Sequence, residues 1–281
     1  MGIADDIRVI PNGAGFQRVD LHVHSFGVSG SECVTDSLMT PAAIVAAAVL
    51  EGIAVVGITD HNSIGNVEAA LAAAQDTTVL VLPGVELATV QGHLLVYFET
   101  FEHLSQFYGK LEFDRGTCRQ TIVQCLESAD ARGGFGIAAH IHTEAGFENR
   151  VPGYGDAKRM IVTNPSLLAL EVAQPGFSSW FSALDPNEPR KALLADRRKA
   201  LQSHDDYLWP TVMFSDAHSL AAPRQAASAS RITRLKMDRP SFAAIRIAFL
   251  DASSRVRTEA EIPGRVPHIV GIKTEGGFLG T

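Results

Sequence analysis

Short runs of β-branched and other apolar residues alternate with alanine- or leucine-rich amphipathic stretches along most of the chain. An apolar run of about four to eight residues is typical of a buried strand, and a longer stretch with a helical repeat is typical of a helix. The strands predicted from this pattern are residues 18–24, 53–59, 78–82, 93–98, 135–139, 168–172, 211–214 and 230–236. The predicted helices are residues 41–51, 64–74, 101–110, 117–132, 190–203 and 239–250.

This alternation of strands and helices predicts βαβ units and a mostly parallel sheet. Because about eight strands occur in one chain, a closed (β/α) barrel is the leading prediction for the fold, and a doubly wound open sheet is the alternative. Thr40-Pro41 and Arg239-Pro240 place proline at or near the first turn of two predicted helices.

Three polar segments interrupt the pattern. Residues 144–165 predict a long loop, and residues 174–189 form a second polar insert with three prolines. After Arg257 the chain is rich in glycine and proline, and only residues 268–272 could form a strand, so this tail is interpreted as a linker.

Composition narrows the class of protein. With 281 residues, 46% hydrophobic and 20% charged, the chain is an ordinary globular protein and is neither disordered nor collagenous. The net charge of −7 argues against general binding of nucleic acids, because such binding depends on positively charged groups of the protein that contact the phosphates. A local basic groove or bound metal ions could still supply the positive charge.

The three cysteines cannot form a disulfide framework, and the N-terminus lacks the features of a secretory signal. Both observations fit a reducing compartment, and a cytoplasmic location is expected. The most apolar stretch, residues 42–58, is interrupted by Glu51-Gly52 and predicts a buried helix, turn and strand. A membrane span would need about 20 unbroken apolar residues, so no membrane association is expected.

Histidines and acids gather where predicted strands end. The pairs are His22-Val23-His24, Asp60-His61, His140-Ile141-His142 and Asp216-Ala217-His218. Residues i and i+2 of a strand share one face, and the C-terminal ends of parallel barrel strands meet at one rim. These pairs are therefore expected to converge, although they lie far apart along the chain.

Such a set of side chains predicts a metal centre. Imidazoles with carboxylates bind Zn, Mn or Fe, whereas Mg and Ca prefer oxygen ligands. Glu86 adds a carboxylate that could bridge two ions, and His93 adds an imidazole, so two or three divalent ions are expected. Clustered ions suit the hydrolysis of phosphate esters.

Other residues of chemical interest have simpler interpretations. His103, His204 and His268 have no acidic or histidine partner nearby in sequence and are interpreted as surface residues. Cys33 follows the first histidine pair and could bind metal, but a buried thiol is the preferred interpretation. Cys118 and Cys125 lie seven residues apart on a predicted helix and are expected to pack in the core.

Six motifs, VDLHVHS, GITDHNS, LPGVELAT, GHLLVYF, AAHIH and FSDAH, occur in an order that resembles the PHP (polymerase and histidinol phosphatase) family of metal-dependent phosphoesterases. The resemblance covers about residues 16 to 252. It implies a distorted seven-stranded, TIM-like (β/α) barrel. The expected division is an N-terminal extension (1–15), a PHP domain (16–252) and a C-terminal tail or linker (253–281).

The resemblance also implies three sets of metal ligands. In the third set the acid lies further from the first histidine pair than in relatives, so Asp36 is the first candidate and Glu32 the second. The sets are His22, His24, Glu86 and Asp216 for one ion; Glu86, His93 and His140 for another; and His61, His218 and that acid for the third.

The implied reaction is hydrolysis of a phosphate ester, in a nucleotide or a nucleic acid, by metal-bound hydroxide. The chain would then act as a nuclease or a phosphatase. Arg150 and Arg224 are candidates for binding the phosphate, because a guanidinium pairs bidentately with it. Asp60 and His142, together with Asp20, are candidates for residues that contact the ligands rather than the metal.

Two longer stretches, residues 84–98 and 235–257, are similar to PHP domains that precede an SMC-like or AAA-like ATPase. This similarity implies a parent protein with a C-terminal ATPase domain. Two alternatives to a phosphoesterase remain open: an amidohydrolase-type hydrolase of small molecules, and a non-catalytic module that the metal ions stabilise.

Overall fold

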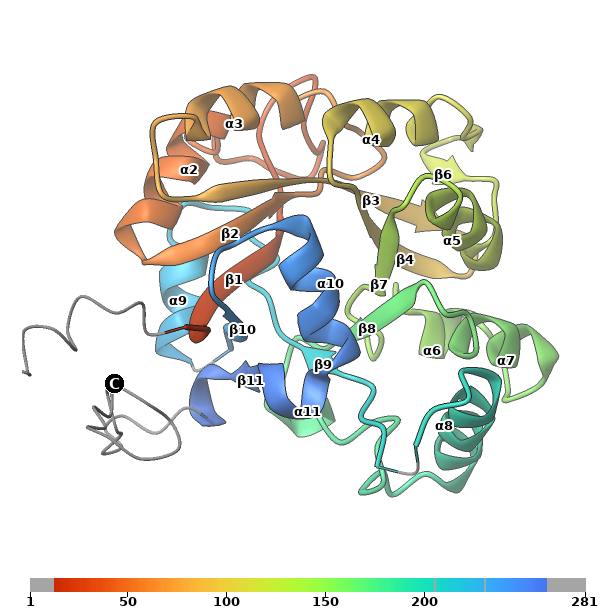
Figure 1. Ribbon diagram of the computed structural model, residues 1–281. Coiled ribbons are helices and arrows are strands. Elements are labelled where there is room, and N and C mark those ends of the chain that lie inside the picture. Colours follow the sequence, from red (N-terminus) through yellow and green to blue (C-terminus); the bar gives the residue numbers. More distant parts are fainter. Residues whose placement is uncertain (1–12, 205, 230, 262–281) are drawn as a thin grey trace, which may run out of the picture.

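The computed structural model of the protein describes residues 13–204, 206–229 and 231–261. Figure 1 shows strands arranged around a common centre with most helices on the outside. The strands are β1 Gly15–Val23, β2 Ile53–Ile58, β3 Leu80–Thr89, β4 Gly92–Tyr97, β5 Phe113–Asp114, β6 Thr117–Cys118, β7 Phe135–Ala138, β8 Leu167–Glu171, β9 Thr211–Val212, β10 Thr233–Met237 and β11 Val256–Thr258. The helices are α2 Pro41–Leu50, α3 Val67–Ala74, α4 Phe101–Tyr108, α5 Ile122–Asp130, α6 Phe147–Arg150, α7 Asp156–Val162, α8 Glu188–Ala200, α9 Ala222–Ser228, α10 Phe242–Leu250 and α11 Ala252–Arg255, with 3-10 turns η1 Pro175–Phe177 and η2 Glu259–Glu261.

The strands form one sheet in the order β11-β10-β1-β2-β3-β4-β7-β8-β9. The chain after β9 returns to the first strand, where Val23 and Ala217 form a parallel bridge. Thr233 at the start of β10 also donates its backbone N–H to the Met213 carbonyl, at 3.0 Å. These contacts nearly close the sheet, which confirms the barrel-like fold and excludes the doubly wound alternative.

The prediction of a mostly parallel sheet was wrong. β1–β2, β2–β3, β7–β8 and β8–β9 are parallel, but β4 runs antiparallel to both β3 and β7, and β10 runs antiparallel to both β1 and β11. Only two residues, Val90 and Gln91, separate β3 from β4. A hairpin connection of this length joins antiparallel strands, whereas parallel strands need a crossover of a dozen or more residues.

Most helix predictions were close, and the exceptions have local causes. Thr40 caps α2 by accepting the Ala43 N–H, with Pro41 in the first turn as predicted. Helix α10 begins later than expected because Ser241, not the residue before Pro240, caps it. The stretch 117–132 begins as strand β6, and its helix starts after the Thr121 capping box. The predicted loop 144–165 contains α6 and α7.

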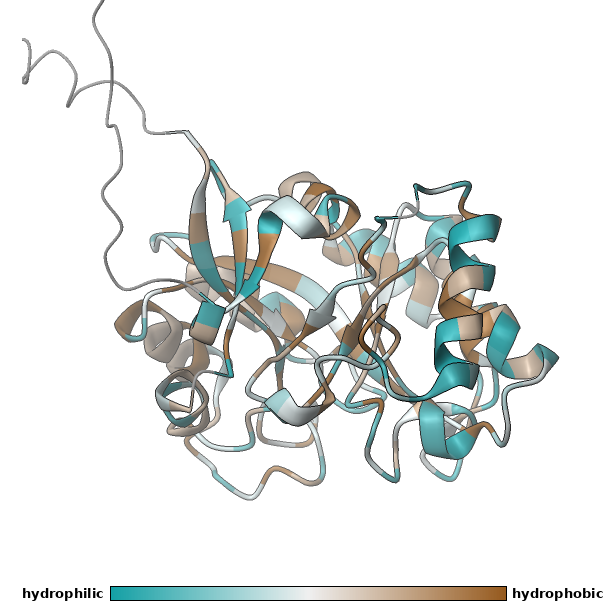
Figure 2. Ribbon diagram, turned by 90° about the horizontal axis from the view of Figure 1, so that it is seen from below, coloured by the Kyte–Doolittle hydropathy of each residue, from teal (hydrophilic) through white to brown (hydrophobic). Residues whose placement is uncertain are grey.

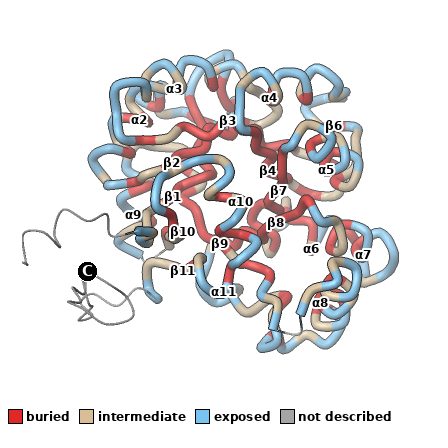
Figure 3. Tube along the Cα trace, viewed as in Figure 1, coloured by how far each residue is buried: buried red, intermediate tan, exposed pale blue. Residues whose placement is uncertain are grey.

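Two clusters of buried apolar residues fill the molecule. Val19 and Leu21 of β1 pack with Ile245 and Phe249 of α10. Helices α2 to α5 pack in the other cluster. Figure 2 shows hydrophobic residues along the central strands, and Figure 3 shows that these strands are buried while the outer faces of the helices are exposed.

Of the predicted C-terminal tail, residues 253–261 are described and include β11, which pairs with β10, whereas the predicted strand 268–272 lies outside the described residues.

Candidate metal centre

The predicted histidines and acids do converge. His22 and His24 come from the end of β1, and His61 follows β2. Glu86 lies within β3, and His93 lies at the start of the antiparallel β4, which returns it to the same rim. His140 follows β7, and Asp216 and His218 follow β9.

Glu86 is at the centre of the cluster and is fully buried. Its Oε1 lies 2.9 Å from His93 Nδ1 and 3.0 Å from His140 Nε2. Its Oε2 lies 3.0 Å from His22 Nε2, 3.3 Å from His24 Nε2 and 3.1 Å from His61 Nδ1. One carboxylate therefore faces five imidazoles with both of its oxygens.

Four donor atoms lie close together, namely Glu86 Oε2, His22 Nε2, His24 Nε2 and Asp216 Oδ1. His22 Nε2 lies 3.1 Å from His24 Nε2 and 3.4 Å from Asp216 Oδ1, and His24 Nε2 lies 3.2 Å from the same Asp216 oxygen. Four ligands held about 2.1 Å from one tetrahedral ion are about 3.4 Å apart. The spacing and the nitrogen and oxygen donor types therefore fit a divalent cation.

The electrostatics of the cluster favour positive charge. Burial by itself raises the pKa of Glu86, but the His22, His140 and His24 side chains outweigh it and hold this pKa well below its usual value. Burial lowers the pKa of His22, but Glu171, Glu86 and Asp216 outweigh it and raise this pKa well above its usual value. The carboxylates are thus negative and attract either protons on the imidazoles or a bound cation.

Behind the cluster, other side chains hold the imidazoles in orientation. The Glu171 carboxylate lies 3.0 and 2.9 Å from His22 Nδ1, so the opposite nitrogen of that ring points to Glu86. The same carboxylate accepts the His140 backbone N–H at 3.1 Å. Ser31 Oγ lies 2.9 Å from His24 Nδ1. Such partners fix the ring orientation that metal binding requires.

Two residues of the cluster have an unusual backbone conformation. His140 and Asp216 have positive φ angles of 27° and 49°, a region that residues other than glycine rarely adopt. Their neighbours hold them there: Ala217 N–H donates to the His22 carbonyl at 3.3 Å, and Ile141 N–H donates to the Glu171 carbonyl at 2.9 Å. The unusual conformations direct the His140 side chain toward Glu86 and the Asp216 side chain toward His22 and His24.

The sequence of residues 20–159 matches the family model described as the PHP domain. Residues 20–159 therefore resemble a PHP domain. This match agrees with the six motifs in the sequence. Among curated proteins, none matches the chain in sequence.

Three solved structures share the fold of this chain. The lesion-specific endonuclease PfuEndoQ from Pyrococcus furiosus has 21% identity and a TM-score of 0.59, and the match covers 86% of this chain and 57% of that one. Endonuclease Q in complex with a 27-mer duplex carrying an abasic lesion has 18% identity and a TM-score of 0.58, covering 86% and 58%. A two-domain protein from Bacteroides vulgatus with a predicted PHP-like metal-dependent phosphoesterase has 18% identity and a TM-score of 0.56, covering 88% and 65%. The present chain thus spans less than two thirds of the length of each.

Other residues predicted for the site lie outside the cluster of donor atoms. Asp36 uses its carboxylate in a turn, where it accepts N–H groups of Leu38 at 3.0 Å and Leu220 at 3.4 Å. Glu32 is exposed. Cys33 was expected to be buried, but it is exposed, with its Sγ 3.2 Å from His218 Nε2.

The three residues predicted to contact the metal ligands have different surroundings. Asp60 binds the Ser25 and Ser31 side chains and therefore reaches His24 only through Ser31. Asp20 accepts the N–H of Ser215, the residue before Asp216, at 3.0 Å. Burial raises the pKa of Asp20 to about 6. The His142 ring turns away from the cluster and stacks on Phe177, with ring centroids 4.1 Å apart.

The two arginines predicted to bind phosphate are not part of the cluster of donor atoms. Arg224 pairs with Glu51 at 2.8 Å, and its side chain is 73% exposed. Arg150 is exposed in α6. Both roles stay predictions.

Glu171 is not among the residues that the sequence predicts for the site. The only signal was a charged residue inside the apolar strand LLALE, where an acid is buried at a cost unless it has partners. The Glu171→Gln variant removes the negative charge behind His22, so we expect it to lower metal affinity by about 10- to 100-fold. Titration of the metal-depleted protein with zinc measures this, and the exposed Glu127→Gln is the control that should bind like the wild type. Equal affinity in all three proteins would contradict the role of Glu171.

Proposed function

We propose that the protein is a metal-dependent phosphoesterase whose centre holds two to three divalent cations, Mn, Zn or Fe, around Glu86. The observation that carries the proposal is the approach of five imidazoles to the two oxygens of one buried carboxylate, with Asp216 beside two of these imidazoles. A degenerate, non-catalytic module would not need to retain so many matched donors.

The proposed ligand sets are those that the motifs imply. One ion would be held by His22, His24, Glu86 and Asp216, and a second by Glu86 with His93 and His140. His61 and His218 belong to a third. When bound, such cations lower the pKa of water and offset the charge of the phosphoryl group and its leaving oxygen.

The exposure of the site residues indicates the side from which a substrate reaches the centre. His22, His24 and Glu86 are fully buried, whereas the Asp216 and His218 side chains are 38% and 39% exposed. Solvent and substrate therefore approach from the side of Asp216 and His218. Glu171 and Ser31 keep the buried imidazoles oriented during the reaction.

The proposed substrates are phosphate esters of nucleotides or nucleic acids. Support comes from the fold shared with endonuclease Q, which has been seen with a lesion-containing duplex at its active site. The net charge of −7 makes tight binding through phosphates alone unfavourable, so the cations are expected to supply much of the attraction. The C-terminal ATPase domain implied by the sequence stays a prediction, as does the location in the cytoplasm. In the described part of the chain, no helix has the length and apolar character to cross a membrane.

Activity on para-nitrophenyl phosphate, its bis-ester and a short oligonucleotide, with added manganese, tests the function. Cleavage of the diesters alone would identify a nuclease, and cleavage of the monoester alone a phosphatase. We expect the His22→Ala/His24→Ala variant to lose both activity and bound metal, because two donors to one ion are removed.

A protein that binds metal fully but cleaves none of these substrates would contradict the proposal. That outcome would favour an amidohydrolase-type reaction or a structural role for the ions. Fewer than one metal equivalent after reconstitution with excess manganese or zinc would contradict the metal centre itself.

A further inference from the structure

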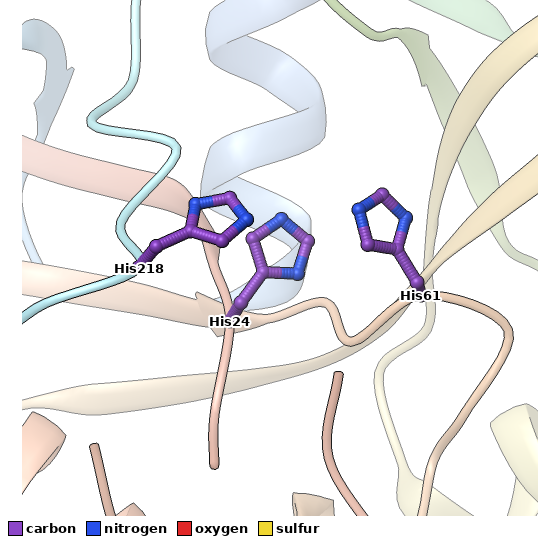
Figure 4. A group of neighbouring side chains, drawn as sticks. All are labelled: His24, His61 and His218. Carbon is purple, nitrogen blue, oxygen red and sulfur yellow. The ribbon is translucent and has the colours of Figure 1, made fainter. Parts of the chain in front are cut away.

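Three imidazoles gather at the exposed side of the cluster. The donor nitrogens of His24, His61 and His218 lie within 4.8 Å of one another. Figure 4 shows the His24 ring between the other two, and its centroid lies 4.6 Å from that of His61 and 4.5 Å from that of His218. His24 Nε2 already faces Glu86 and Asp216, so an ion between His61 and His218 needs a further ligand from elsewhere.

Cys33 is held beside this group. Its Sγ lies 3.2 Å from His218 Nε2. It belongs to a turn in which the Val34 N–H donates to the Ser31 carbonyl at 3.0 Å. Ser31 in turn contacts two members of the group, because its Oγ lies 2.9 Å from His24 Nδ1 and accepts the His61 N–H at 2.9 Å.

Contacts with the residues that follow β1 also hold the turn in place. Ser31 N–H donates to the Ser25 carbonyl at 2.9 Å, directly after the first histidine pair. Gly30 fits against that carbonyl only because it has no side chain, since a Cβ there would lie 2.3 Å from the Ser25 oxygen. The position of Cys33 at the imidazoles is therefore imposed by the strand that carries the ligands.

The acids of the same loop have other positions. Both oxygens of Asp36 accept backbone N–H groups, from Leu38 and Leu220. Glu32 is exposed and makes no hydrogen bond to any residue that the structure describes. The thiol is thus the ligand type that the loop presents to His218.

We propose that the Cys33 thiolate, with His61 and His218, binds the third metal ion. This inference rests on the proposed metal centre and replaces the carboxylate expected from the sequence. On binding, the cation forms a bond to sulfur and the thiol proton passes to solvent. A thiolate ligand favours zinc over manganese or magnesium at this position, because sulfur is a soft donor.

Cobalt(II) substitution tests the assignment without relying on activity. Cobalt accepts the same ligands, and a thiolate bond gives a charge-transfer band in the near ultraviolet. We expect this band in the wild-type protein and its loss in Cys33→Ser, with one fewer cobalt equivalent bound. The buried Cys118 and Cys125 remain in that variant, so they serve as an internal control for other thiols.

The matched control is Asp36→Asn, which removes the carboxylate but keeps one acceptor oxygen for the Leu38 N–H of the turn, and it should retain the band and the full cobalt content. Full cobalt binding without the band, or loss of an equivalent in Asp36→Asn alone, would overturn the role of Cys33 while leaving the metal centre intact. No cobalt binding in the wild-type protein would overturn both proposals. Circular dichroism of each variant checks that the fold is kept.

Discussion

The Glu86→Gln variant is expected to lose more than about 100-fold of the proposed phosphoesterase activity, which exceeds the upper end for residues that only support a metal ligand. Glutamine keeps the size of the side chain but replaces one oxygen with an N–H₂ group that cannot bind metal. Both Glu86 oxygens face imidazoles, at 2.9 to 3.1 Å for the shortest contacts, so either orientation of the amide removes a shared ligand. Elemental analysis should show at least one metal equivalent fewer.

The control for this variant is Glu99→Gln, the same substitution at an exposed position after β4. It should keep full activity and metal content. If Glu86→Gln bound metal and cleaved substrate like this control, Glu86 would not bridge two ions, and the proposed centre would have to be built differently.

The Arg197→Met variant is expected to lower the free energy of unfolding by about 4 kcal/mol. Arg197 is 1% exposed, and its guanidinium donates to the carbonyls of Val162, Asn164 and Leu167 at 2.6 to 2.9 Å. Methionine fills similar space but leaves these three carbonyls without a charged donor. The loss corresponds to a fall in Tm of about 10 °C for a protein of this size.

Thermal or urea denaturation measures the effect, and Lys199→Met on the exposed face of α8 is the control, expected to change stability by less than about 0.5 kcal/mol. Arg197 also stacks over Trp209, with the guanidinium carbon 4.2 Å from the ring centroid. An unchanged unfolding free energy in Arg197→Met would mean that this contact and the three hydrogen bonds are replaced by water at no cost.

Most strands could be predicted because their residues are buried on both faces and carry continuous apolar runs. IAVVGI of β2 and FGIA of β7 are examples. The strand direction could not be predicted in the same way, because an apolar run is the same whether the strand runs parallel or antiparallel. The return of β10 along β1 depends on contacts between residues up to 222 apart in sequence, such as Gly15 with Met237.

By itself, the sequence determined which residue types could form the site, because histidine and carboxylate pairs follow the ends of apolar runs. Only the tertiary structure decided how they point. The pairing of β1 with β2 shifts register between Asp20 and Val23, so Leu21 and Val23 pack in different clusters and His22 faces Glu86. It also decided that Glu171 supports His22 and that Cys33, rather than Asp36, lies against His218, because these contacts join segments 149 and 185 residues apart.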